Sequence, residues 1–394
     1  MKAEKIKNYI IICLFLVFIF GFCVFSFMED DREFSEMENR TLQQFPEFSY
    51  ESVKNGDFTK QFETYMADQV FLKDELVSVK TISELAFLKS KQNDVYFGSD
   101  SFYLKEFREN DEQIDKNIGY INSFADGLPD DVSVSFLLAP NAVSVLSDKL
   151  PLISDNDDQA DAAKHIENEL SDRIGFVCPI EEMKSADGKD GFYYRTDHHW
   201  TAEGAKFGFD ALMNKMGEDI PEVQFEEESL KDFYGTMYSQ APFALAKSDE
   251  ITLLTQKDNR ITVKYTGPAG DHTVPEACES IDGISQKDGL FADELKDVKD
   301  KYATFMGGNF SMIEITAEGT ESDESVLILK DSYCNTMMPY FCSKYKNITM
   351  CDLRYFGMDT QTVSQYISEN GIKKVICVYN IDFINTDNSF VWLE

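Results

Sequence analysis

The chain is poor in positive charge and in paired cysteines, and each shortage removes a class of function. It carries 37 lysine and arginine residues against 71 aspartate and glutamate residues, for a formal net charge of −34. Such an acidic surface repels the phosphates of nucleic acids, so we expect no nucleic-acid partner. The eight cysteines include no C-x-x-C pair, so neither a zinc ribbon nor a redox motif is indicated. The sequence leaves open whether two of Cys278, Cys334 and Cys342 form a disulfide.

One long apolar run decides the expected compartment. Residues 9–28 carry no charge, and these 20 residues in a helix would reach about 30 Å, the thickness of a bilayer core. Three lysines precede the run and three acidic residues follow it. Because positive flanks stay in the cytoplasm, we expect an uncleaved single-pass anchor at residues 1–28, with the rest of the chain extracytoplasmic at the cell membrane. A cleaved signal peptide is the alternative, but the run ends in Phe-Ser-Phe-Met rather than in small residues.

Beyond the anchor the sequence predicts two further regions. Residues 29–131 form a juxtamembrane and helical N-terminal region, in which apolar residues recur at spacings of three and four between positions 57 and 88. Residues 132–394 form an α/β domain. An irregular, β-rich insertion interrupts this domain at about 221–320, where short alternating runs stand among glycine, aspartate and serine.

The C-terminal part of the chain indicates the fold most clearly. Apolar runs at residues 326–329, 348–353 and 375–379 predict strands that alternate with helical segments, and residues 132–139 predict one more strand. Alternating strands and helices predict right-handed βαβ units, and hence a parallel sheet flanked by helices. Ligands of such sheets bind at the carboxyl ends of the strands, and Ser332 stands at such an end.

Histidine is scarce, and two of the four histidines stand together in the segment Asp197-His198-His199-Trp200. The segment precedes a predicted helix at residues 201–217, so we expect it to be extended. Alternate residues of an extended segment point to the same side, so the carboxylate of Asp197 can orient the imidazole of His199. His199 is therefore the candidate general base, and His198 has a structural or substrate-contacting role.

Ser332 is the candidate nucleophile. It follows a predicted strand and opens a predicted helix, whose free N–H groups stabilise developing negative charge. A serine that attacks a carbonyl carbon there has neighbouring amides to hold the oxyanion. The structural alternative is that Ser332, or Asp331 before it, only caps the helix, as serine and aspartate commonly do.

Two other interpretations of the histidine pair stay open. Two histidines and a carboxylate can form a metal site, although adjacent residues of an extended segment rarely converge on one ion. Neither His165 nor His272 stands at a spacing that would complete such a site. The pair could instead be part of a structural cluster around a buried Trp200.

A resemblance to the bacterial DHHW family is carried by five segments of the sequence. These are Tyr193-Tyr194-Arg195-Thr196-Asp197-His198-His199-Trp200-Thr201, Lys330-Asp331-Ser332-Tyr333-Cys334-Asn335, Cys351-Asp352-Leu353-Arg354-Tyr355-Phe356, Gly307-Gly308-Asn309 and Glu38-Asn39-Arg40. The family is similar to the SGNH-hydrolase-like domains of alginate O-acetyltransferase proteins. The resemblance implies a flavodoxin-like parallel sheet and a catalytic triad of Asp197, His199 and Ser332.

The resemblance also implies a reaction and a set of partners. Ser332 would form an acyl-enzyme, and the acyl group, expected to be acetyl, would pass to a carbohydrate hydroxyl or to water. The substrate would be a cell-envelope or secreted polysaccharide, an integral membrane O-acyltransferase would supply the acyl group, and no cofactor or metal would be needed. The alternative is a catalytically inactive glycan-binding protein or scaffold for that membrane enzyme.

One departure from the SGNH pattern concerns the oxyanion site. Lys330 stands where the usual block has a glycine, whose lack of a side chain would let the backbone approach the substrate. The backbone N–H of Ser332 and the side chain of Asn309 are then the candidate oxyanion donors. Arg195, His198 and Asn141 are further candidates for oxyanion or substrate contact.

Overall fold

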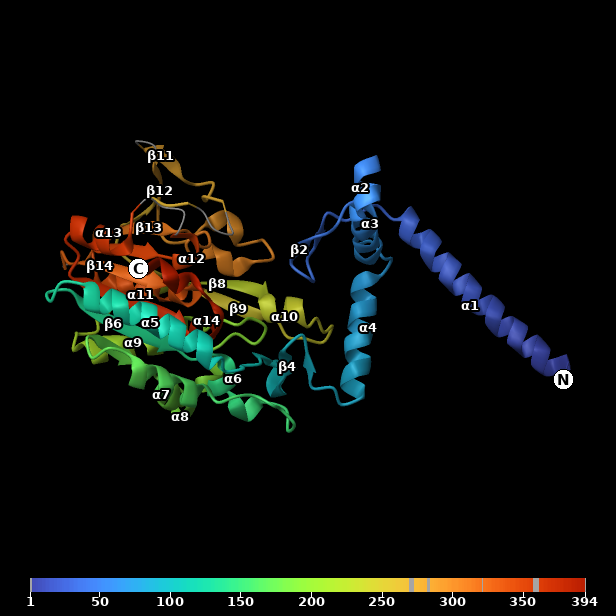
Figure 1. Ribbon diagram of the computed structural model, residues 1–394, viewed down its shortest axis with the longest axis horizontal. Helices are drawn as coiled ribbons and strands as arrows, with labels where there is room; N and C mark the ends of the chain where they lie inside the picture. Colours follow the sequence, from blue (N-terminus) through green and yellow to red (C-terminus); the bar gives the residue numbers. More distant parts are fainter. Residues whose placement is uncertain (1, 269–272, 282–283, 321, 357–360, 394) are drawn as a thin grey trace. The chain divides into compact units, whose positions relative to one another are not determined.

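The computed structural model describes residues 2–268, 273–281, 284–320, 322–356 and 361–393 (Figure 1). The chain divides into two compact units. The first comprises residues 1–89 with 238–246, and the second comprises residues 90–237 with 247–394. The predicted boundaries at residues 28, 131, 221 and 320 stay predictions, although the first strand predicted for the α/β domain does begin at Ser133.

The first unit is mainly helical. Its helices are α1 (Lys2–Met28), α2 (Tyr50–Asn55), α3 (Asp57–Asp68) and α4 (Lys73–Ala86), and β1 (Phe34–Ser35) pairs with β2 (Arg40–Thr41). Within the described chain, α1 is the one helix long and apolar enough to cross a membrane, over Lys5–Met28, and none of that stretch is buried. A signal sequence would meet the same test, so the finding establishes an apolar N-terminal helix.

The second unit is built on a large mixed sheet. Nine described strands pair in the order β11 (Glu279–Ile281), β12 (Ile284–Asp288), β10 (Ile261–Tyr265), β13 (Met312–Ala317), β15 (Asn347–Cys351), β14 (Ser325–Lys330), β16 (Lys374–Asn380), β6 (Ser133–Ala139) and β7 (Ile174–Val177). Neighbours from β15 to β7 run parallel, and neighbours from β11 to β15 run antiparallel.

The prediction of a parallel sheet therefore holds for one half of the sheet and needs correction for the other. Strands β10, β11, β12 and β13 all come from the region interpreted as an insertion, and they extend the main sheet. The same region also forms a separate ribbon of β8 (Phe225–Phe233) and β9 (Asp249–Gln256). Antiparallel pairing needs no crossover helix, which is why this region lacks the alternation of strands and helices that marked the rest.

Helices flank the sheet and bury both faces of its parallel half. They include α5 (Asp111–Gly127), α7 (Gln159–Glu169), α8 (Ile180–Ser185), α9 (Ala202–Met216), α11 (Met338–Lys344), α13 (Val363–Glu369) and α14 (Ile381–Thr386). Burial on both faces explains the unbroken apolar runs in β6, β14 and β16. Three short strands, β3 (Lys91–Gln92), β4 (Val95–Phe97) and β5 (Tyr103–Lys105), form a small antiparallel sheet beside this core.

The cysteines play no cross-linking role. All eight are free thiols, and Cys334, Cys342, Cys351 and Cys377 are buried in the core. The disulfide left open among Cys278, Cys334 and Cys342 is therefore not formed. Burial raises the pKa of the Cys377 thiol to about 12, so this side chain behaves as a small hydrophobic group.

Candidate active site

The candidate nucleophile lies at the carboxyl end of β14, on a short 3₁₀ helix at Ser332–Met337. Asp331 caps this helix: one carboxylate oxygen accepts from the backbone N–H of Tyr333 at 2.8 Å. The other oxygen accepts from the backbone and side-chain amides of Asn380, at 2.6 and 2.7 Å, and so ties the turn to the end of β16. Because Asp331 does the capping, the hydroxyl of Ser332 is free for another contact.

That contact is with His199. Nε2 of His199 lies 2.7 Å from Oγ of Ser332, and Nδ1 lies 2.6 Å from Oδ1 of Asp197. The same carboxylate oxygen accepts from the backbone N–H of His199 at 3.0 Å. An ionised carboxylate can only accept, so Nδ1 of His199 carries the proton and Nε2 offers its lone pair to the Ser332 hydroxyl. The two-residue spacing thus brings all three predicted groups into one hydrogen-bonded line.

Asp197 is held from its other side by Thr236, at the start of α10 (Thr236–Gln240). Oδ2 accepts from the backbone N–H of Thr236 at 2.9 Å and from its hydroxyl at 3.1 Å. This approach requires the preceding Gly235, since a Cβ atom there would lie 2.3 Å from the Asp197 side chain. Burial opposes ionisation of Asp197, but attraction to the two imidazoles and these hydrogen bonds hold its pKa well below the usual value.

His198 lies beside the carboxylate of Asp197 but outside the hydrogen-bonded line, with its Nδ1 3.7 Å from Oδ1 of Asp197. Its Nδ1 lies 2.7 Å from the hydroxyl oxygen of Thr236. Because that hydroxyl already donates to Asp197, Nδ1 of His198 must be the donor, which leaves Nε2 with an unshared lone pair. Burial and repulsion from His199 lower the pKa of His198 to about 3, so the ring is neutral near pH 7. Its side chain remains 33% exposed, and its ring centroid lies 3.8 Å from that of His199.

Tyr302 covers the face of the candidate base. Its ring stacks on the imidazole of His199 with centroids 3.7 Å apart and planes at 6°. The Tyr302 hydroxyl donates to the backbone carbonyl of Ser332 at 2.8 Å and lies 2.7 Å from the hydroxyl of Thr336. One buried tyrosine therefore contacts both the base and the turn that carries the nucleophile.

Lys330 is fully buried just before the nucleophile, with its side chain 1% exposed. Its ammonium donates to the side-chain carbonyl oxygens of Asn309, at 2.8 Å, and Asn335, at 3.0 Å. It also lies 3.5 Å from Asp352, a buried carboxylate that Arg354 grips with two hydrogen bonds. Burial lowers the pKa of Lys330, and Asp352 opposes that effect. The oxygen of Asn309 thus points at Lys330, and its NH₂ group is the end left for another acceptor.

The structure draws two of the weaker candidates into structural contacts. The side-chain amide of Asn141 donates to the Tyr333 hydroxyl at 2.7 Å, and its oxygen accepts from Gln159 at 2.9 Å. The guanidinium of Arg195 lies 5.2 Å above the ring of Phe102. Among the described residues, neither side chain forms a hydrogen bond or an ion pair with Asp197, His199 or Ser332, so the structure does not bring them to the hydrogen-bonded line.

Trp200 is structural, as one interpretation of the cluster held. It is completely buried, and its indole N–H donates to the backbone carbonyl of Tyr333 at 2.9 Å. The hydroxyl of Tyr333 in turn donates to the backbone carbonyl of His198. These two bonds fasten the histidine segment to the nucleophile turn, so the structural and the functional interpretations apply to different residues of one segment.

A metal interpretation meets an obstacle in the donor set. The ligand atoms of Asp197, His198 and His199 lie within 4.8 Å of one another. However, both oxygens of Asp197 already accept hydrogen bonds, and the two ring nitrogens of His199 face Asp197 and Ser332. His165 is paired with Asp115 at the surface, and His272 lies outside the described residues. The residues present therefore fit a proton-transfer chain better than a metal site.

Sequence reasoning missed Thr236 and Tyr302, which both come from the region interpreted as an insertion. A third missed residue is Asp249, whose carboxylate accepts from the backbone N–H groups of Arg195 and Thr196 at 2.8 and 2.7 Å. Asp249 thereby holds the entry to the histidine segment. The one available signal was Gly235, because an isolated glycine can mark a close approach of the backbone.

Comparisons with known proteins bear on the family and the fold. A family model described as DHHW protein matches residues 81–351. The structure resembles a DHHW family protein from Eubacterium siraeum with a TM-score of 0.63 and 22% identity, over 76% of this chain and 94% of that one. It resembles Bacillus cereus PatB1 with a TM-score of 0.59 and 22% identity, over 74% of this chain and 97% of that one.

Other matches add less. A second PatB1 structure, with a TM-score of 0.59 and 20% identity over 76% of this chain and 98% of that one, contains a sulfonyl adduct. The O-acetyltransferase domain of Pseudomonas putida AlgJ matches with a TM-score of 0.46 and 13% identity, over 75% of this chain and 93% of that one, which is too distant to carry an argument. No curated protein matches the chain. At these identities the solved structures establish a shared fold.

Proposed function

The chain belongs to the DHHW family, and we propose that it is an acyl-transfer enzyme that uses Ser332 as nucleophile, His199 as base and Asp197 as the group that orients the base. One observation carries the proposal. Hydrogen bonds of 2.6 and 2.7 Å link Asp197, His199 and Ser332 in an unbroken line, with the serine at the start of a helix at the carboxyl edge of the sheet. This is the arrangement that acyl transfer through serine requires.

The first half of the proposed reaction loads the serine. Nε2 of His199 takes the hydroxyl proton as Oγ of Ser332 attacks the carbonyl carbon of an acyl ester. The carboxylate of Asp197 stabilises the imidazolium that forms, and its lowered pKa keeps it ionised while it does so. When the tetrahedral intermediate collapses, the alcohol of the donor leaves with the proton from His199, and the acyl group remains on Ser332.

The second half of the proposed reaction transfers the acyl group from Ser332 to an acceptor. An acceptor hydroxyl gives its proton to His199 and attacks the acyl carbon, and Ser332 leaves as an alcohol that recovers the proton. A carbohydrate hydroxyl as acceptor makes the protein an O-acetyltransferase, and water makes it an esterase. His198 suits an acceptor with hydroxyl groups, because its neutral, partly exposed ring keeps a lone pair on Nε2 beside the base.

Two groups are proposed to hold the oxyanion of the tetrahedral intermediates. Ser332 is the first residue of its helix, so its backbone N–H has no helical partner. The NH₂ group of Asn309 is the second donor. Lys330 and Asn335 both donate to the oxygen of that amide, which leaves its NH₂ group for the oxyanion. Donors preorganised in this way stabilise the intermediate more than the substrate.

The proposed setting is the outer face of the cell membrane. The apolar helix α1, with lysines before it and acidic residues after it, supports an uncleaved anchor that leaves the second unit extracytoplasmic. The family resemblance supports an SGNH-like catalytic unit, a polysaccharide substrate and a membrane O-acyltransferase as the acyl source. In this setting α1 keeps the enzyme beside its acyl donor.

The test is turnover of p-nitrophenyl acetate by the full-length protein in detergent, with Ser332→Ala as the matched control. The proposal expects release of p-nitrophenol that the substitution abolishes, and faster release when soluble oligosaccharides are added as acceptors. Circular dichroism of both proteins controls for folding. Equal, background-level release by two folded proteins would contradict the proposal and favour a non-catalytic glycan-binding or scaffold role.

A further inference from the structure

The loop at residues 69–72, between α3 and α4, packs against the last turns of α1. The ring of Phe71 stacks on that of Phe25 with centroids 5.5 Å apart, and meets that of Phe22 edge-on at 5.8 Å. The backbone N–H of Phe71 donates to the hydroxyl of Ser26 at 3.0 Å. The loop is therefore in contact with the end of the apolar helix itself through Phe71, which stands between the apolar residues Val70 and Leu72.

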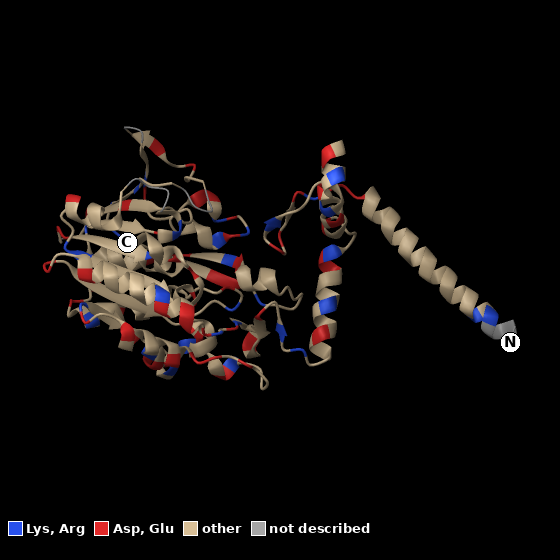
Figure 2. Ribbon diagram, viewed as in Figure 1, with Lys and Arg blue, Asp and Glu red and all other residues tan. Residues whose placement is uncertain are grey.

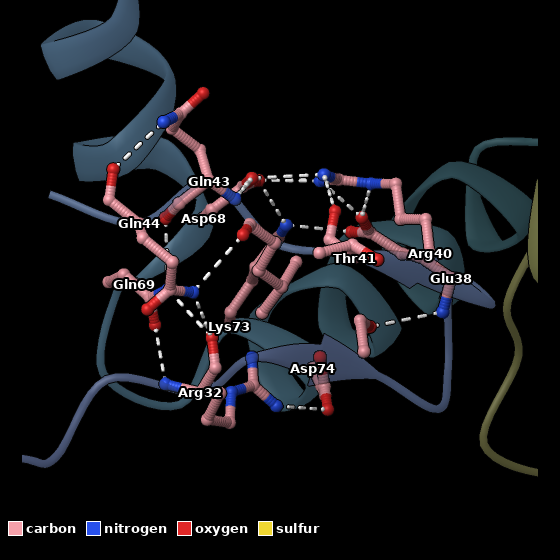
Figure 3. A network of polar contacts seen from close by, with 12 residues as sticks. Arg32, Glu38, Arg40, Thr41, Gln43, Gln44, Asp68, Gln69, Lys73 and Asp74 are labelled. Carbon is pink, nitrogen blue, oxygen red and sulfur yellow. Dashed lines mark hydrogen bonds and ion pairs between the residues drawn. The ribbon is translucent and has the colours of Figure 1, made fainter. Parts of the chain in front are cut away.

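A polar network holds this loop in place (Figure 3). The side chain of Gln69 accepts from the backbone N–H of Arg32 at 3.0 Å and donates to its carbonyl at 2.9 Å. The guanidinium of Arg32 binds Asp74 at 2.9 Å, on the other side of the loop. Both ends of the loop are thus hydrogen-bonded to the segment that follows α1. These bonds hold Phe71 against α1.

The second brace is an ion cluster around the buried carboxylate of Asp68 (Figure 3). Arg40 binds it with both terminal nitrogens, and Lys73 binds it at 3.1 Å. Glu38 completes the cluster through Lys73, at 2.9 Å. Asp68 ends α3 and Lys73 begins α4, so the cluster fixes the two helices on either side of the loop.

The conformation of Leu72 is unfavourable for a protein loop in water. Its φ is 54°, in the left-handed region that leucine seldom adopts, and the residue is 45% exposed. Such a backbone conformation is strained and persists only where its surroundings impose it. This backbone conformation exposes an aliphatic side chain next to Phe71. Contact of that side chain with water is unfavourable.

The positions of Phe22 and Phe25 along α1 indicate the depth at which Phe71 would lie in a membrane. Phe25 precedes the first acidic residue after the helix, Glu29, by four positions, and Phe22 precedes it by seven. At the rise of an α-helix these separations are about 6 and 10 Å. If α1 spans the membrane, its charged end marks the water interface, and Phe71 lies below that level, in the depth range of interfacial anchors.

We propose that the 70–72 loop inserts into the outer leaflet beside α1 and contacts lipid acyl chains. The inference rests on the proposed anchor. With two points of contact, α1 and the loop, the first unit would hold a fixed orientation on the membrane and could not swivel about a single helix. The partner is the hydrocarbon edge of the bilayer itself.

The test measures quenching of tryptophan fluorescence in vesicles of phosphatidylcholine brominated on its acyl chains. Full-length Phe71→Trp and Leu72→Trp place the probe in the loop, and Leu72→Trp covers the case in which the larger ring at 71 disturbs the contact with α1. Tyr50→Trp is the matched control, because Tyr50 is 83% exposed and lies beyond the far end of α3, a helix about 18 Å long. The native Trp200 and Trp392 set the wild-type baseline.

The inference expects a blue-shifted probe at position 71 or 72 that loses most of its added emission to bromolipid, while the probe at position 50 does not. Equal behaviour of the loop and control probes, whether quenched or not, would overturn it. Phe18→Trp, inside the apolar stretch, tests the membrane anchor separately from the loop. If that probe is not quenched, α1 does not span the membrane, and the anchor and the loop inference both fail. If it is quenched and the loop probes are not, the anchor stands and only the loop inference fails.

Discussion

Thr236 donates both its backbone N–H and its hydroxyl to one carboxylate oxygen of Asp197, at 2.9 and 3.1 Å. The other oxygen accepts a hydrogen bond from Nδ1 of His199, so both carboxylate oxygens of Asp197 have partners. A hydrogen bond to a charged group contributes about 1.5–3 kcal/mol. We therefore predict that Thr236→Ala lowers the acylation rate by about tenfold or more, measured as the burst of p-nitrophenol release.

Thr236→Ser is the matched control for that substitution, because it keeps the hydroxyl and the backbone amide. It should retain most of the activity. If the alanine and serine variants were equally active and equally stable, the hydroxyl would play no part in orienting Asp197.

Tyr302 should matter to catalysis through its ring more than through its hydroxyl. Tyr302→Phe keeps the stack on His199 and loses the bonds to Ser332 and Thr336, whereas Tyr302→Leu loses both. Aromatic stacking contributes about 0.5–1.5 kcal/mol, so the leucine variant should lose up to about tenfold in kcat beyond the phenylalanine variant, with KM nearly unchanged. The measurement is steady-state kinetics, with thermal unfolding as the folding control. A larger loss in the phenylalanine variant would contradict this assignment.

Lys330 and Asn309 should act as a unit. Removing one oxyanion donor costs about 10²–10³-fold in rate, so we predict a loss of that order for Asn309→Ala. Lys330→Met, which keeps the length of the side chain, should lose part of that by freeing the Asn309 amide to rotate. In the double variant, Lys330→Met should add little to the loss of rate caused by Asn309→Ala. The reason is that the hydrogen bond from Lys330 then has no Asn309 amide to orient.

Full additivity of these two losses would show that Lys330 does not act through Asn309. Because Lys330 is buried beside Asp352, each variant needs its unfolding midpoint measured, so that a loss of folded protein is separated from a loss of rate.

The stability of the protein should fall between about pH 6.5 and pH 4 in a way that depends on His198. The pKa of His198 is lowered to about 3 in the folded chain, against about 6.5 when unfolded. In this window the unfolded chain binds a proton that the folded chain does not, so the free energy of unfolding rises with pH and is lost on acidification. The lowered pKa of Asp197 adds a loss of the same sign only below about pH 4.

His198→Asn isolates the contribution, because an asparagine amide can donate to Thr236 in place of Nδ1. The variant should show a smaller drop in unfolding midpoint than wild type when the pH is lowered from about 7 to about 4.5. His165, whose pKa is raised by Asp115, contributes equally to both proteins. An identical pH dependence in the two proteins would mean that His198 is not held neutral.

The sequence predicted the residues that carry local signals and missed those that depend on long-range pairing. Asp197 and His199 follow from the two-residue period of an extended segment, and Ser332 follows from its place after an apolar strand. Tyr302 and Thr236 carry no such signal, because antiparallel pairing of β10 with β13 and of β8 with β9 brings their region to the site. Alternating apolar residues predict that such strands exist but not which strands they pair with.

The same limit explains the mixed sheet. The parallel half was predictable, since βαβ units alternate strands and helices along the chain. The antiparallel half came from a region whose short strands resembled an irregular insertion. The structure gives the side chains of the candidates Asn141 and Arg195 other partners, Tyr333 and Gln159 for the first and Phe102 for the second.

The central claim is that Ser332 carries an acyl group, and intact-protein mass measurement tests it most directly. The full-length protein is mixed briefly with p-nitrophenyl acetate, quenched with acid, and compared with Ser332→Ala treated in the same way. The account predicts that wild type gains the mass of one acetyl group, that peptide mapping places it on Ser332, and that the variant gains none. Equal labelling of both folded proteins, or labelling of neither, would contradict it.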